Sequence, residues 1–100
     1  MRTRIKELCR EKGMTISSIA EQIGTTQTSL SRALGDNGNP TLETLEKVAG
    51  ALDVDVQELF ASLSGGIIGV IRVGDTNYNI NSVPDLSRLL DGIERGEITI

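Results

Sequence analysis

The chain has 100 residues, the size of one compact domain or of a small domain with an appendage. Its 10 basic and 14 acidic residues give a formal net charge of −4, which argues against a non-specific nucleic-acid coat with a broad basic surface. With no His and a single Cys, the sequence lacks the usual zinc ligands, catalytic triads and Cys–His nucleophiles. We therefore expect no enzymatic activity, no metal and no cofactor.

Other features favour a cytoplasmic location. Cys9 has no second cysteine with which to form an internal disulfide, which is typical of a reducing compartment. No apolar run approaches the ~18 residues that a membrane-spanning helix needs. The first six residues, Met-Arg-Thr-Arg-Ile-Lys, lack the apolar stretch of a secretion signal. We expect a cytoplasmic protein that does not interact with membranes.

The charge is distributed unevenly along the chain. Residues 1–35 hold six basic and three acidic residues, a net of +3, whereas residues 36–62 hold one basic and six acidic residues, a net of −5. Residues 63–100 add −2. This gradient predicts that residues 1–35 form a basic surface that can face phosphates and that residues 36–62 form an acidic surface turned away from them.

Apolar residues recur at helical spacing in five short stretches before residue 64. The first predicted helix carries Ile5, Leu8 and Cys9 and ends at Gly13, a residue type that commonly terminates helices. The second ends at Gly24, and a loop rich in turn-forming residues, 35–40, follows the third. A residue suited to N-capping precedes each of the last four helices: Thr15, Thr26, Thr41 and Asp55, the last with Glu58 in a capping box.

The pattern changes after Ser64-Gly65-Gly66. Residues 67–73 are rich in β-branched side chains, Gly74-Asp75 is a turn signal, and residues 78–81 alternate apolar with polar; together they predict a β-hairpin. A helix start follows at residues 82–85, with Pro84 in the first turn and apolar residues at helical spacing up to residue 93. Residues 97–100 are compatible with a last edge strand.

Residues 15–34 carry the strongest functional signal, because two short helices joined by a tight turn form a helix-turn-helix. Ala20 is small enough for the second helix to cross closely, Gly24 permits a left-handed turn, and Leu30 anchors the second helix in the core. With these residues turned inward, four polar residues face outward: Gln27, Thr28, Ser31 and Arg32. A short-chained, polar and nearly uncharged face suits the major groove of DNA.

Residues 4–60 resemble the lambda-repressor/Cro-like (XRE-type) family of prokaryotic and phage DNA-binding domains. The matching stretches are Ile-Lys-Glu-Leu-Cys-Arg-Glu-Lys-Gly-Met-Thr, Ile-Ala-Glu-Gln-Ile-Gly-Thr-Thr-Gln-Thr-Ser-Leu-Ser-Arg and Asn-Pro-Thr-Leu-Glu-Thr-Leu. They cover a little over half of the chain in the family's order. The resemblance implies that the helix over residues 27–34 is a recognition helix that enters the major groove.

The resemblance also implies roles for individual residues. Gln27 is expected to bind an adenine edge, Thr28 to touch a thymine methyl group, and Arg32 to read guanine or bind a phosphate. The remaining expected DNA contacts, to the phosphate backbone, are Thr26, Ser31, Asn37, Asn39 and a basic N-terminal arm with Arg2 and Arg4. Two positions depart from the family pattern: Ile16 replaces a polar residue that usually touches the DNA backbone, and Asp36 lies in a loop that is often basic.

The predicted fold is mainly α: a five-helix lambda-repressor-like domain over residues 1–63, a Ser/Gly linker over 64–66, and a hairpin-plus-helix extension over 67–100. A lone hairpin and one helix cannot bury enough surface to be stable alone, so the extension either packs on the helical core or pairs with a second copy. We favour the second arrangement. The residues expected to dimerise are Ile67, Ile68, Val70, Ile71, Tyr78, Ile80, Leu89 and Leu90.

The sequence thus predicts a dimeric, sequence-specific transcriptional regulator, a repressor that binds double-stranded DNA at a pseudo-palindromic operator. Its two recognition helices would lie about one DNA turn apart, ~34–36 Å. Two alternatives remain open. One is the antitoxin of a toxin–antitoxin pair, whose extension neutralises the toxin. The other is a protein-interaction module that has the fold but does not bind DNA.

Overall fold

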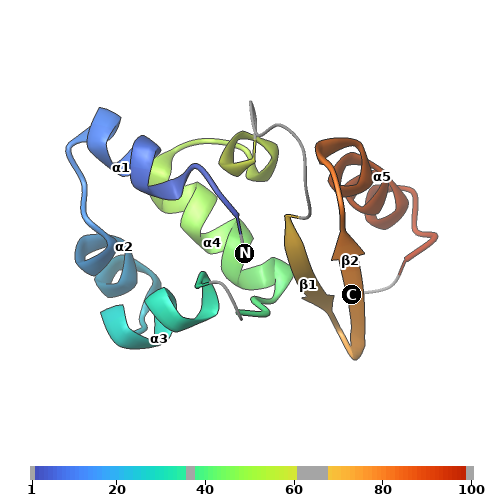
Figure 1. Ribbon diagram of the computed structural model, residues 1–100, viewed down its shortest axis with the longest axis horizontal. Coiled ribbons are helices and arrows are strands. Elements are labelled where there is room, and N and C mark those ends of the chain that lie inside the picture. Colours follow the sequence, from blue (N-terminus) through green and yellow to red (C-terminus); the bar gives the residue numbers. More distant parts are fainter. Residues whose placement is uncertain (1, 36–37, 61–67, 99–100) are drawn as a thin grey trace.

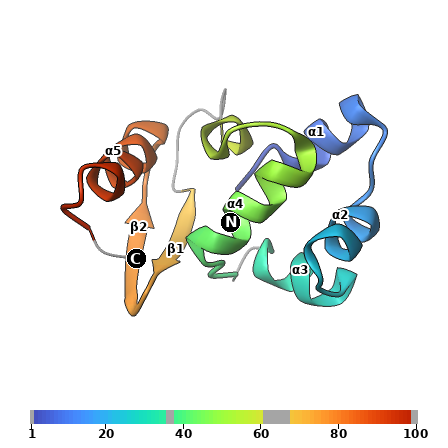
Figure 2. The same cartoon turned by 180° about the vertical axis from the view of Figure 1, so that it is seen from behind.

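The computed structural model describes residues 2–35, 38–60 and 68–98. Its elements are, in order, α1 (Ile5–Lys12), α2 (Ile16–Ile23), α3 (Gln27–Ala33), α4 (Leu42–Leu52), the 3-10 helix η1 (Val56–Leu59), β1 (Gly69–Val73), β2 (Thr76–Ile80) and α5 (Val83–Glu94). Helices α1, α2 and α3 lie on one side of α4, and the hairpin lies between α4 and α5 (Figure 1, Figure 2). The predicted mainly helical fold with a terminal hairpin and helix is confirmed. The predicted linker at 64–66 falls outside the described residues.

Threonine caps begin three of the helices, as predicted. The backbone N–H groups of Ser18, Ser29 and Thr44 each donate to the hydroxyl of the threonine three residues earlier, at 3.1 Å. The capping box predicted at Asp55 is wrong, because the Asp55 side chain makes no cap hydrogen bond. Instead, the Glu58 N–H donates to the Asp55 carbonyl at 2.9 Å, so the backbone itself closes a single 3-10 turn.

The hairpin has the predicted two-residue turn, Gly74-Asp75, and pairs Ile71 with Tyr78 across its antiparallel strands. Successive side chains point to opposite faces of the hairpin, and the face that carries Ile71, Val73 and Ile80 is buried. The last edge strand does not form over the part of it that the structure describes: the N–H groups of residues 97 and 98 both donate to the Gly92 carbonyl, at 2.9 and 3.1 Å. The chain therefore folds back onto the end of α5.

The core is shared between the five helices and the extension. Leu59, Phe60, Ile71 and Leu86 are fully buried in one continuous cluster with the inner faces of α1 to α4. Four of the eight residues expected to dimerise, Ile68, Ile71, Ile80 and Leu89, are buried inside this single chain. Val70, Tyr78 and Leu90 are half-buried, and Ile67 lies outside the described residues.

Backbone hydrogen bonds fasten the extension to the helical part. The Arg2 N–H donates to the Ile68 carbonyl and the Arg4 N–H to the Leu59 carbonyl, both at 2.7 Å. On the other side, the Arg72 N–H donates to the Pro40 carbonyl at 3.0 Å, next to a parallel bridge between Thr41 and Arg72. In residues 2–35, 38–60 and 68–98, no helix has both the length and the apolar character needed to cross a membrane.

Candidate nucleic-acid interface

Helices α2 and α3 form a helix-turn-helix whose turn is set by local chemistry. Gly24 ends α2 in the left-handed conformation, with φ 80°, and the Thr25 N–H donates to the Ala20 carbonyl at 2.9 Å. Thr26 then caps α3. Ala20 and Leu30 are each 1% exposed, so the inward residues of the motif are those predicted.

Helix α3 presents its polar residues to solvent. Gln27, Thr28, Ser31 and Arg32 are all exposed, while Leu30 is the residue that α3 buries. None of the ion pairs formed by the described residues involves Arg32. The structure therefore brings the predicted helix contacts together on one outward face, with Thr26 at its start.

Ser17 is a site residue that the sequence analysis missed. Its hydroxyl donates to Oε1 of Gln27 at 2.7 Å, which joins the start of α2 to the start of α3. Both side chains are exposed, so the bond serves no core packing. The bond uses the Oε1 atom of Gln27 and not its Nε2 group, which is the donor of that amide. The sequence carries no local signal for this pair, because ten residues and a turn separate its partners.

The other predicted contacts make bonds within the chain. Arg4 is held by the Glu7 carboxylate at 3.3 Å and the Glu58 carbonyl at 3.4 Å, and its side chain is 18% exposed. The Asn39 side chain donates to that of Asn77 in β2 at 3.0 Å. Arg2 is exposed and its backbone is bonded to the start of the hairpin, while Asn37 lies outside the described residues. Arg2 and Asn39 thus lie at the junction with the extension, and Arg4 lies beside the end of η1.

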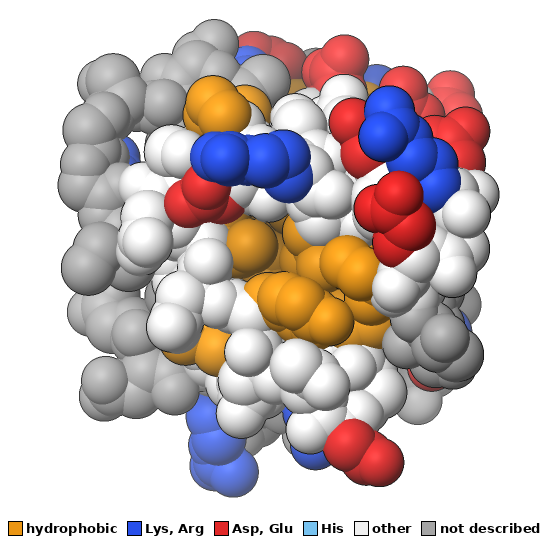
Figure 3. All heavy atoms as spheres, turned by 90° about the vertical axis from the view of Figure 1, so that its right-hand side faces the viewer, with side chains coloured by type: hydrophobic (Ala, Val, Ile, Leu, Met, Phe, Trp, Pro, Cys, Tyr) orange, Lys and Arg blue, Asp and Glu red, His pale blue; other side chains and the backbone are white. Residues whose placement is uncertain are grey.

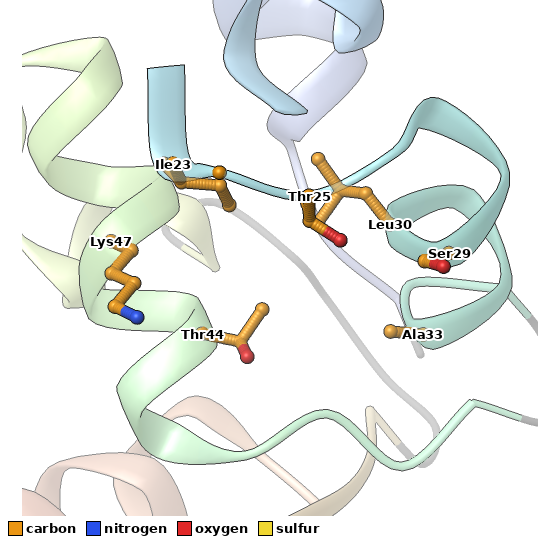
Figure 4. A pocket seen from close by; sticks show the side chains of 8 residues that line it. Ile23, Thr25, Ser29, Leu30, Ala33, Thr44 and Lys47 are labelled. Atoms are coloured by element: carbon orange, nitrogen blue, oxygen red, sulfur yellow. The ribbon is translucent and has the colours of Figure 1, made fainter. Parts of the chain in front are cut away.

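A hollow of about 310 Å³ lies behind α3, on the side opposite its polar face. Thr25, Ser29 and Leu30 line one wall and Thr44 and Lys47 of α4 line the other (Figure 4). The Lys47 ammonium group forms an exposed ion pair with Glu43 at 3.3 Å. The contact between α3 and α4 is therefore incomplete, and Leu30 is the buried residue that anchors α3.

Cys9 has no part in this surface. It is buried on the inner face of α1, and burial raises the pKa of its thiol. A thiol that is buried and protonated at neutral pH is a poor nucleophile and metal ligand. Its role is to pack the core.

Comparison with known proteins agrees with this geometry. The helix-turn-helix family model matches residues 5–59. The chain is 28% identical over 92 residues to the immunity repressor protein of Bacillus phage phi105, an alignment that covers 92% of this chain and 60% of that protein. It is 40% identical over 57 residues to the HTH-type transcriptional regulator SinR of Bacillus subtilis, covering 56% of this chain and 51% of that protein. SinR of Bacillus licheniformis matches with the same values.

The chain thus spans about half to three-fifths of the length of these relatives. No solved structure matches it at a comparable level of significance. Because the match to the phage protein takes in 92% of the chain, it includes the hairpin as well as the helix-turn-helix. The family match and the observed geometry of α2, the turn and α3 lead to one assignment: the chain belongs to the helix-turn-helix family.

Proposed function

We propose that this chain is a sequence-specific, cytoplasmic DNA-binding transcriptional regulator that inserts α3 into the major groove. The observation that carries the proposal is the exposed polar face of α3, whose first residue, Gln27, is held by Ser17. A major groove about 12 Å wide admits one α-helix, and a glutamine amide can pair with the N6 and N7 atoms of adenine. Fixing the Gln27 amide in advance lowers the conformational entropy lost on binding.

The remaining contacts follow from where the side chains lie. Thr28 and Arg32 are on the same outward face, within reach of a thymine methyl group and of guanine or a phosphate. Ser31 lies on this face with a hydroxyl group that can donate to a phosphate. The Thr26 hydroxyl at the start of α3 donates to Ser29 Oγ at 2.9 Å, so Thr26 would bind a phosphate by exchanging that bond. The names of the relatives, an immunity repressor and a transcriptional regulator, support regulation by DNA binding, and the first supports repression.

The charge distribution favours selectivity over tight non-specific binding. The net charge is −4, and the helix-turn-helix itself, residues 15–34, carries one acidic and one basic residue, Glu21 and Arg32. Non-specific affinity rises with the number of phosphates that basic side chains neutralise. A protein with few such contacts discriminates mainly through bases, and each good bidentate base contact contributes roughly 1–3 kcal/mol.

Selection from a random pool of double-stranded DNA at low salt tests the proposal. We expect the wild-type protein to enrich one motif. Gln27→Ala should relax the base preference at one position, and Arg32→Ala should weaken binding. Arg10→Ala, which removes an exposed positive charge from α1, is the matched control and should change neither. No enriched motif, or equal effects of the Arg10 and Arg32 variants, would contradict the proposal.

We further propose that two copies associate through the face formed by β2 and α5. This end of the molecule exposes an apolar patch framed by charged groups (Figure 3). Tyr78, Ile80, Leu89 and Ile98 line a hollow of about 430 Å³ there, with the Asp85–Arg88 ion pair at its edge. A two-fold axis at this face relates the two α3 helices by symmetry, which fits a pseudo-palindromic operator.

Sedimentation velocity tests this dimer. Ile98 is half-buried at the patch, so Ile98→Glu should give a folded monomer with weaker operator binding. Ala51→Glu introduces the same charge at a half-buried position of α4 outside the patch and should leave the dimer intact. A wild-type protein that sediments as a monomer at micromolar concentration would contradict the association, and capture of another protein by the patch would reassign it to a different partner.

A further inference from the structure

We propose that the outer face of the hairpin is a second DNA-contacting surface, which binds the sugar-phosphate backbone next to the bases contacted by α3. This outer face consists of Val70, Arg72, Asn77 and Asn79. The inference rests on the proposed DNA binding and extends it from a single helix to a helix and a hairpin.

The alternation of side chains along each strand determines which residues lie on the outer face. Arg72 lies opposite Asn77 in the register, and Val70 lies opposite Asn79. Because Ile71, Val73 and Ile80 on the other face are buried in the core, the hairpin cannot turn its polar side inward. Arg72, Asn77 and Asn79 are exposed. A strand face that carries one arginine and two asparagines contributes nothing to the core and has the donors that DNA backbone contacts use.

The outer face is continuous with the segment that follows α3. The Asn39 side chain donates to that of Asn77 at 3.0 Å, and the Arg72 N–H donates to the Pro40 carbonyl at 3.0 Å. At Gly38, a Cβ atom would lie 2.0 Å from the Ala33 carbonyl oxygen, so the segment leaves α3 in close contact with its last turn. The end of α3, residues 38–41 and the hairpin therefore form one connected surface.

The arrangement of the elements suits a duplex that lies along this surface. In Figures 1 and 2 the hairpin turn, α3 and the start of α4 all lie along the lower edge of the molecule. The longest dimension of the protein is 35 Å. Since one turn of B-DNA spans about 34–36 Å, the hairpin meets the backbone within one turn of the bases under α3.

The chemistry of the outer face identifies phosphate as the group it binds. Arg72 forms none of the ion pairs among the described residues, and a guanidinium group pairs well with phosphate oxygens. The asparagine amide at position 77 adds a neutral donor. Asn79 also borders the hollow at the proposed dimer face, so the DNA contact is assigned to Arg72 and Asn77. Asp75 at the turn repels phosphates, so the contact lies along the strands near Arg72 and not at the hairpin tip. The face carries no aromatic side chain that could stack on an unpaired base, which favours duplex DNA.

Hydroxyl-radical footprinting and salt-dependent binding, both on the selected DNA motif, test this surface. We expect the wild-type protein to protect backbone positions next to the α3 contacts on one side. Arg72→Ala should lose that protection and lower the slope of log K against log[salt] by about 0.9, the value for one phosphate contact. Its base preference should remain that of the wild type. Asp75→Asn should have the opposite effect and bind more tightly.

Arg10→Ala removes the same charge from α1, at the opposite edge of the molecule in Figures 1 and 2, and should keep the wild-type footprint and slope. Thermal unfolding confirms that each variant is folded. A wild-type footprint and slope for Arg72→Ala would overturn the inference while leaving DNA binding by α3 intact. A changed base preference would also overturn it, because the hairpin would then read bases. Failure of the wild-type protein to bind any DNA would instead refute the proposed function.

Discussion

Replacing Leu30 by alanine tests how the recognition helix is held in place. Leu30 is 1% exposed and is the residue that α3 buries. Leucine-to-alanine changes in protein cores cost about 2–5 kcal/mol, and the cost rises with the volume of the cavity that remains. Leu30 borders the hollow of about 310 Å³ behind α3, so part of the new space joins a volume that is already open. We therefore expect a loss of about 2–3 kcal/mol in the free energy of unfolding, the lower part of that range.

The matched control is Leu45→Ala in α4. Leu45 is 0% exposed and does not line that hollow, so its removal leaves a closed cavity and should cost about 4–5 kcal/mol. Equilibrium urea unfolding measures both losses. Amide hydrogen exchange in the Leu30 variant should accelerate first in α3, because its packing is lost locally, and operator binding should weaken more than in the Leu45 variant.

Two results would refute this reasoning. The first is a Leu30 variant that loses as much stability as the Leu45 variant, since the hollow would then not relieve the cavity. The second is unchanged hydrogen exchange in α3, since other contacts would then hold the helix. Either result would show that α3 is packed more completely than the geometry of its inner face indicates.

Further predictions concern the turn, the buried thiol and the Gln27 side chain. Gly24→Ala should destabilise the protein by about 1–2 kcal/mol, because φ at this position is 80°. Gly50→Ala should stabilise it by about 0.5–1 kcal/mol, because position 50 lies within α4, where alanine favours the helix more than glycine does. The midpoints of urea unfolding measure both changes. Burial raises the pKa of the Cys9 thiol in the folded state above its ordinary value of 9.0. The contribution of the thiol to the free energy of unfolding is therefore complete below pH 9.0 and is lost as the pH rises through the raised pKa. Cys9→Ala should flatten the alkaline fall in unfolding free energy, and an identical fall in both proteins would contradict this. Ser17→Ala should keep the fold but weaken the base preference at the position that Gln27 reads, by about 0.5–1.5 kcal/mol in competition binding; an unchanged preference would show that Gln27 needs no support.

Much of the helical part could be predicted from the sequence because its determinants are local. A threonine cap, a glycine turn and an apolar stripe act within a few residues, and they correctly place α2, α3 and the face that holds Gln27 and Arg32. The 3-10 turn after Asp55 shows where such reasoning fails. The capping pattern was present there, yet the chain makes only one turn before Phe60 enters the core.

The tertiary structure decided everything that depends on contacts between distant segments. Alternation in the hairpin shows that one face is buried, but it does not say whether the partner is α4 of the same chain or a second copy; the structure shows Ile71 and Ile80 in the chain's own core. The same holds for polar side chains such as Arg4 and Asn39. Their residue types suit phosphate, and the fold brings the Glu58 carbonyl within bonding distance of Arg4 and the Asn77 side chain within bonding distance of Asn39. Local sequence therefore determined which faces are apolar or polar, and long-range packing determined what each face meets.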